Sequence, residues 1–146
     1  MSRHGRFESY AERAEKRKEN AMKRGHNAPI PHNLWRVIIP IAREYEAGNV
    51  DIAVLYSYLL AHVNGQPDND RYMSAFTSVD RIAKETRIGR NRIARLIDVL
   101  VAVGLLETTY DYTGNKREKL YYPTYYSELS EAEIRRRLDE LYEAEG

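Results

Sequence analysis

The sequence predicts a mainly helical α+β fold that carries one small β-hairpin. Apolar residues recur at helical spacing in several segments, most cleanly from Ile93 to Val101. Segments 105–112 and 119–126 are rich in β-branched and aromatic residues and flank a Thr-Gly-Asn-Lys turn, which indicates a hairpin. The chain has 146 residues, of which 42% are apolar, enough for a single core.

Residues 1–27 are predicted to form a basic N-terminal arm. From Met1 to His26 there are eight Lys or Arg residues against four acids. Ser9 and Glu12 have the spacing of a capping box, and good helix formers follow them. The apolar positions are too sparse for a continuous stripe, so we expect the arm to be disordered or a loose helix when free.

Residues 28–126 are predicted to form the folded domain. Segment 32–47 has helical spacing but contains Pro40, so we expect a kinked helix or two short pieces. Segment 51–63 is strongly apolar and is expected to be the central helix of the core. A short strand is expected near 75–77, after a polar loop.

A helix, a tight turn and a longer helix follow. Thr77 or Ser78 is expected to cap the first helix, and residues 87–89 to make the turn. The second helix begins at Arg90 and is expected to end at Gly104, which can adopt the left-handed conformation.

The start of this second helix is rich in arginine and asparagine. If Ile93 marks the buried face, Asn91 and Arg95 each lie about 160° away and point outward, while Arg90 and Arg92 flank them. Arginine can bond guanine edges and asparagine adenine edges in the major groove. The pattern therefore predicts double-stranded DNA binding, although exposed helix positions are often charged without any ligand.

Other cations and aromatic residues could add to such a surface. Lys116, Arg117 and Lys119 lie at or beside the hairpin turn, where they could contact the DNA backbone or could simply keep the turn soluble. Lys84, on the first of the two helices, is a weaker phosphate candidate. The tyrosines of the hairpin could stack on unpaired bases or fill space between strands.

The order of these elements resembles the winged helix-turn-helix superfamily. Preceding segments, at Ile30-Pro31 and 55–64, look like the N-terminal winged-helix domains of plasmid and phage replication initiators and DnaD-like primosome proteins. Ligand-responsive repressors of the MarR and PadR type share the same core pattern. The pattern is carried here by Ser78, Ile82, Ala83, Thr86, Ile88, Arg90, Ile93, Ile97, Leu100, Gly104, Leu105 and Leu106.

The resemblance, which covers roughly 29–126, implies a winged helix with extra N- and C-terminal helices. In the superfamily the second helix reads DNA and the wing touches backbone or minor groove, which carries onto Asn91, Arg92, Arg95 and Arg117. Gly89 departs from the Ser or Thr cap that relatives commonly have there. The implied role is transcriptional regulation or plasmid or phage replication control. The alternative is a protein-interaction adaptor in replication or DNA segregation.

Residues 127–146 are predicted to form a C-terminal helix, because Ser130 and Glu133 make a capping box. Its narrow apolar stripe is too small for stability alone. The helix either packs on its own domain or pairs with a second copy. We expect a homodimer, because repressors of this class usually bind paired half-sites.

Several classes of protein are excluded or disfavoured. The absence of cysteine excludes disulfides and thiolate metal sites, and fits a cytoplasmic location. We expect neither a signal peptide nor a membrane partner. The four histidines are scattered and no phosphate-binding loop is present, so we expect no enzyme, no catalytic or metal-binding residues and no cofactor. A small-molecule effector remains open.

Overall fold

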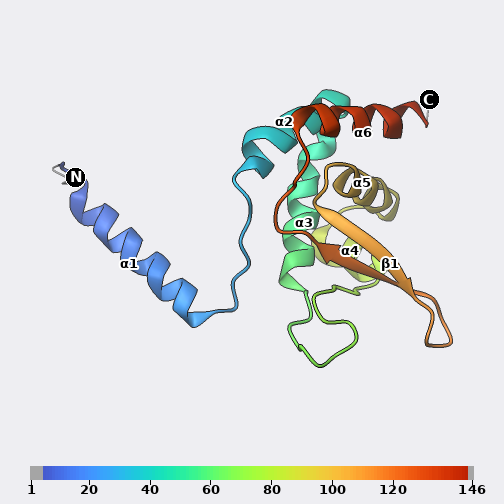
Figure 1. The fold of residues 1–146 in the computed structure, drawn as a ribbon, viewed down its shortest axis with the longest axis horizontal. Helices are drawn as coiled ribbons and strands as arrows, with labels where there is room; N and C mark the ends of the chain where they lie inside the picture. The colour runs from blue at the N-terminus through green and yellow to red at the C-terminus, as the bar shows by residue number, and fades with distance from the viewer. Residues whose placement is uncertain (1–4, 145–146) are drawn as a thin grey trace.

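The computed structural model describes residues 5–144, and over that range the chain is mainly helical with a two-stranded antiparallel hairpin. The predicted α+β class is therefore confirmed (Figure 1). The hairpin consists of β1 (Leu106–Asp111) and β2 (Glu118–Pro123). In chain order the helices are α1 (Glu8–Arg24), α2 (Ile39–Tyr45), α3 (Ile52–Ala61), α4 (Val79–Thr86), α5 (Arg90–Ala102) and α6 (Glu131–Glu143).

The helix expected over 32–47 is two short pieces. A π-helical turn, Leu34–Ile38, runs directly into α2, whose first turn contains Pro40. Proline has no N–H to donate, and Pro40 stands at the junction where the π-helical turn passes into α2. A 3₁₀ turn, Ala47–Asp51, then connects α2 to α3.

The core is centred on α3, which packs against α5. Both helices contribute several side chains that are completely buried. On α3 these are Ile52, Leu55, Tyr56 and Leu59, and on α5 they are Ile93, Leu96, Val99 and Leu100. The apolar stripe predicted for α5 is thus buried except at its last member, Val101, which is 38% exposed.

Local sequence signals fix the α4–α5 pair. Ser78 caps α4 by accepting a hydrogen bond from the Arg81 N–H at 3.2 Å. Arg87 adopts the left-handed conformation that turns the chain toward α5. Beyond α5, Gly104 has a φ of +82°, and a Cβ there would lie 2.6 Å from Ser127 Oγ. Glycine is therefore required at this position for both conformation and space.

The hairpin register pairs Leu106 with Pro123 at its base and Asp111 with Glu118 at its end. The short strand expected near 75–77 is reduced to one bridge, in which Ala75 and Tyr121 exchange two backbone hydrogen bonds of 2.8 Å. This bridge joins the loop before α4 to the inner strand of the hairpin.

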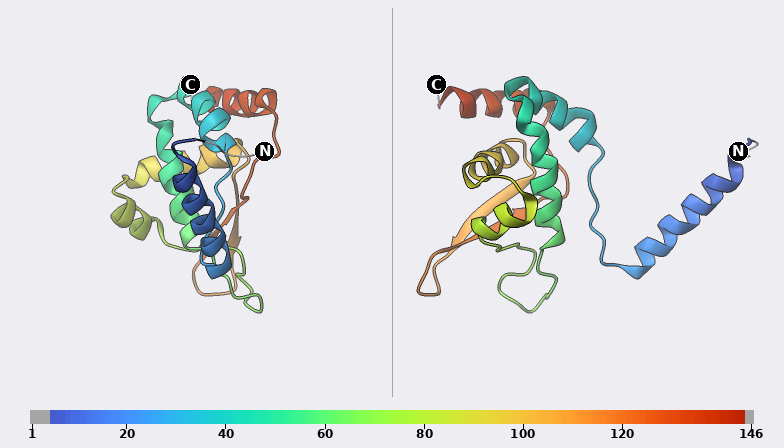
Figure 2. Two further views of the ribbon diagram at one scale, coloured as in Figure 1. Left: turned by 90° about the vertical axis from the view of Figure 1, so that its left-hand side faces the viewer. Right: turned by 180° about the vertical axis from the view of Figure 1, so that it is seen from behind.

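The two terminal helices differ in their packing. Every side chain of α1 is exposed or partly exposed, and the helix projects away from the rest of the chain on an extended linker (Figures 1 and 2). Helix α6 instead lies against α2 and α5, with Ile134 and Leu138 buried. Ser130 caps it by accepting from the Glu133 N–H, as the sequence predicts. The structure thus shows α6 packed on its own domain. The pairing of α6 with a second copy stays a prediction.

Among residues 5–144, no helix combines the length and the apolar character needed to cross a membrane.

Candidate nucleic-acid interface

The structure divides the predicted DNA-contacting residues into two groups. Five of them are exposed, and they lie on α4, at the start of α5 and at the hairpin turn. The other three are partly buried. The exposed group is Lys84, Arg90, Asn91, Lys116 and Arg117, and the partly buried group is Arg92, Arg95 and Lys119.

Arg92 and Arg95 form ion pairs with the same carboxylate, that of Glu46. Arg92 Nη1 lies 2.7 Å from one oxygen of Glu46, and Arg95 Nη2 lies 2.7 Å from the other. The side chains of Arg92, Arg95 and Glu46 are only 26%, 23% and 33% exposed. Burial alone would raise the pKa of Glu46, but hydrogen bonds from Arg95 and Arg92 outweigh it and lower the pKa.

A tyrosine of α6 completes this cluster. The Arg95 guanidinium carbon lies 4.3 Å from the centre of the Tyr142 ring, a cation–π contact. The hydroxyl of Tyr142 accepts a hydrogen bond of 2.9 Å from buried Asn49. Arg92 passes beside Gly48, where a Cβ would lie 2.6 Å from Arg92 Nη2. The cluster therefore ties α5 to α6 and to the chain between α2 and α3.

The prediction that Arg95 points freely outward is wrong, and Arg92 is engaged in the same way. Helical periodicity places Arg95 on the side of α5 away from Ile93. However, α6 and the segment around Glu46 cover that flank of the helix. Helical periodicity describes only one buried face and carries no information about a second neighbour.

The first turn of α5 keeps its exposed polar side chains. Arg90 Nη1 pairs with Asp80 at 3.0 Å, but the two side chains are 69% and 74% exposed. An ion pair this exposed contributes little and can be exchanged for another anion. Asn91 is exposed beside it. Within the described chain no side chain caps α5 at Gly89, so its first N–H groups are open to a phosphate.

The hairpin tip (residues 112–117) presents cations next to aromatic rings. Lys116 and Arg117 are exposed, and Arg117 Cζ lies 4.4 Å from the centre of the Tyr110 ring. Lys119 Nζ lies 5.7 Å from the same ring and 5.8 Å from that of Tyr121. Lys119 is therefore partly covered by rings, whereas the tip cations reach solvent.

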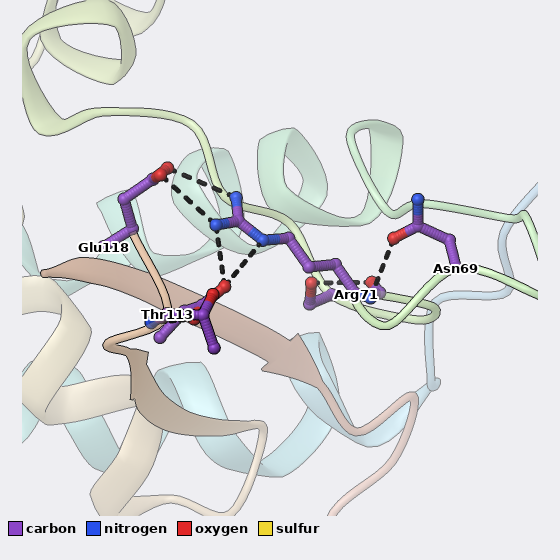
Figure 3. A network of polar contacts seen from close by, with 6 residues as sticks. Asn69, Arg71, Thr113 and Glu118 are labelled. Atoms are coloured by element: carbon purple, nitrogen blue, oxygen red, sulfur yellow. Dashed lines mark hydrogen bonds and ion pairs between the residues drawn. The ribbon is translucent and has the colours of Figure 1, made fainter. Parts of the chain in front are cut away.

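An arginine that the sequence interpretation did not select holds the hairpin in place. Arg71, in the loop after α3, donates to Asp111 Oδ2 at 2.8 and 3.1 Å and to Glu118 at 3.2 Å (Figure 3). Thr113 donates two further hydrogen bonds to Asp111. Hydrogen bonds from Thr113, and then from Arg71, lower the pKa of Asp111 to about 2.

One sequence signal could have revealed this contact. Asp111 and Glu118 stand directly opposite each other across the hairpin, and like charges in that position repel. A cation from elsewhere in the chain is needed to neutralise them, and Arg71 supplies it. Glu46 gave no comparable signal, because its partners are 46 and 49 positions away.

Comparisons with protein families, with curated proteins and with solved structures give no match for this chain. In the part of the chain that the structure describes, no group of three or more His, Asp or Glu side chains could hold a metal ion. Any functional conclusion therefore depends on the geometry of the candidate surface itself.

Proposed function

We propose that residues 28–126 form a winged helix-turn-helix that binds double-stranded DNA. In this proposal α4 and α5 are the two helices of the motif, and the β1–β2 hairpin is the wing. The observation that carries it is the first turn of α5, where exposed Arg90 and Asn91 flank an uncapped helix N-terminus. Residues at this position of the second helix are the ones that reach base edges in such proteins.

Arg92 and Arg95 have a structural role in this proposal, because both form ion pairs with Glu46. These arginines orient α5 against Glu46 and α6, and base contacts fall to Arg90 and Asn91. Lys84, Lys116 and Arg117 supply contacts to phosphates. Because phosphate contacts carry no sequence information, the expected sequence preference is modest and the expected salt dependence is steep. The proposed role is transcriptional regulation or plasmid or phage replication control, with the protein acting as a homodimer.

The test is duplex binding measured by fluorescence anisotropy over a series of salt concentrations. The affinity should fall linearly with salt on logarithmic axes, and the slope should decrease by about one for each phosphate-contacting cation that is removed. The variants are Arg90→Ala and, as a matched control, Arg43→Ala, which removes an exposed arginine from α2. Equal losses for Arg90→Ala and Arg43→Ala would contradict a binding surface on α5.

A protein-interaction adaptor is the second candidate, and one observation favours it. Beyond its first turn, the exposed face of α5 carries Ala94, Asp98 and Val101, a combination that suits a protein surface better than phosphate. The same anisotropy series separates the two functions. An adaptor would show no salt-dependent duplex binding, and substitution of Val101 would weaken its binding to a partner protein.

A further inference from the structure

The end of the β1–β2 hairpin that lies next to its turn has two chemically different faces. On one face Asp111 and Glu118 lie opposite each other and are held by Arg71 (Figure 3). On the other face Tyr110 lies opposite Lys119 in the register. The rings of Tyr110 and Tyr112 are 6.1 Å apart between centres, so they form one aromatic surface.

The tyrosines of this second face are buried to very different extents. Tyr121, nearest the core, is 1% exposed, Tyr110 is 38% exposed and Tyr112 is 69% exposed. Filling space between strands accounts for Tyr121 but not for Tyr112, which lies at the tip with most of its ring in water. Tyr112 is therefore free to contact a ligand.

The cations around these rings indicate what kind of ligand would fit. Arg117 lies 4.4 Å from the Tyr110 ring centre, and Lys119 approaches the same ring from β2. Lys116 is exposed next to Arg117. A flat ring with open faces beside several cations matches an unpaired nucleotide, whose base can stack while its phosphate is neutralised. A paired base inside a duplex offers no free face to such a ring.

We propose that the aromatic face of the hairpin tip, formed by Tyr110, Tyr112 and Arg117, binds an unpaired nucleotide of single-stranded nucleic acid by stacking. Tyr112 supplies the open ring, while Arg117 and Lys116 contact the phosphates on either side. Arg71 acts as a positioning residue, because it holds the opposite face of the hairpin to the loop after α3. The ligand differs from the duplex of the proposed function, so each proposal can fail without the other.

The test is anisotropy with labelled probes: oligothymidine of about 20 nucleotides, RNA of the same length, and a duplex. Tyr112→Leu should weaken oligothymidine binding by at least about fivefold, because stacking on an aromatic ring is lost. Tyr112→Phe keeps the ring and should bind as the wild type does. Tyr126→Leu is the matched control, since Tyr126 is 56% exposed but lies away from the tip, beyond the end of β2. The RNA probe shows whether the site distinguishes the two kinds of strand.

A second readout separates stacking from simple charge attraction. A strand that carries 2-aminopurine should lose fluorescence on binding to the wild type and to Tyr112→Phe, but much less on binding to Tyr112→Leu. Arg71→Ala should weaken single-strand binding although Arg71 itself is turned to the other face, and Arg81→Ala is its control on α4. Duplex affinity should not change in Tyr112→Leu.

Three results would overturn the proposal. The first is that oligothymidine and RNA both fail to bind. The second is that Tyr112→Leu and Tyr126→Leu lose affinity equally, and the third is that Tyr112→Leu weakens the duplex as much as the single strand. If duplex binding is absent while single-strand binding depends on Tyr112, the proposed function fails and this inference stands.

Discussion

The arginines on the flank of α5 and the cations of the hairpin tip have similar sequence signatures but different surroundings. Arg92 and Arg95 share the carboxylate of Glu46 and are about three-quarters buried. No ion pair within residues 5–144 engages Lys116 or Arg117, and both are exposed. The difference shows that positive charge on a predicted surface helix becomes a binding surface only if no other element of the fold covers it.

The two regions also differ in what their charges stabilise. In the α5 cluster the charges are partly removed from water, and both guanidinium groups donate hydrogen bonds to Glu46. At the hairpin tip the charges are solvated, and they contribute little to folding. Substitutions in the first region should therefore change stability, whereas substitutions in the second should change nucleic-acid binding.

The largest effect is expected for Glu46→Ala. This change leaves two partly buried guanidinium groups without their shared carboxylate, and it should lower the free energy of unfolding by about 1–3 kcal/mol. Chemical denaturation measures the change. Glu44→Ala is the matched control, because its ion pair with Arg135 is exposed and should contribute much less. Similar losses of unfolding free energy in the two variants would show that the ion pairs of Glu46 contribute no more than an exposed ion pair does.

A smaller effect on stability is expected for Arg95→Ala, paired with Arg117→Ala. Arg95→Ala removes the contacts with Glu46 and Tyr142 and should lower the free energy of unfolding by about 1 kcal/mol, with duplex affinity unchanged. Arg117→Ala should leave stability unchanged and weaken nucleic-acid binding. Denaturation and anisotropy on both variants test this reciprocal pattern. A loss of duplex affinity in Arg95→Ala that exceeds the loss in Arg117→Ala would restore the flank of α5 as the contact surface.

The elements that local sequence determines could be predicted, and the contacts between distant elements could not. The buried stripe of α5, the caps at Ser78 and Ser130 and the left-handed Gly104 follow from residues within a few positions of each other. The partners of Arg92, Arg95 and Asp111 come from segments about 40 to 50 positions away. Such contacts depend on how helices pack, which periodicity does not describe.

This limit explains why the candidate site was only partly predictable. The exposure of Arg90, Asn91, Lys116 and Arg117 agrees with the sequence prediction, and the contacts described for Arg90 and Arg117 come from Asp80 and Tyr110, which are close in the sequence. The prediction for Arg95 failed because a second flank of α5 is covered by α6, whose position the sequence left open between its own domain and a second copy.

The hydrogen bonds that Thr113 and Arg71 donate to Asp111 should make the stability of the hairpin depend on pH at low pH. Thr113 and Arg71 lower the pKa of Asp111 from its ordinary value of 3.8 to about 2. Since the pKa is depressed in the folded state, the stabilisation is fully present above pH 3.8 and is lost as the pH falls through about 2. An NMR titration of the carboxyl group measures the midpoint. Thr113→Ala and Arg71→Ala should each raise it, because each removes a side-chain hydrogen bond that lowers the pKa of Asp111. A wild-type midpoint near 3.8 would show that the hydrogen bonds from Thr113 and Arg71 to Asp111 are not formed in solution.

The smallest effect is expected for Lys116→Ala, and it concerns only the salt dependence of binding. Lys116 is exposed at the tip, so its loss should leave folding unchanged. If its ammonium neutralises one phosphate, the slope of log affinity against log salt should decrease by about one, by a similar amount for every DNA sequence. Anisotropy on two unrelated duplexes measures this. A decrease confined to one of the duplexes would mean that Lys116 reads base edges. That result would contradict the proposal that α5 contacts bases while the hairpin contacts only phosphates.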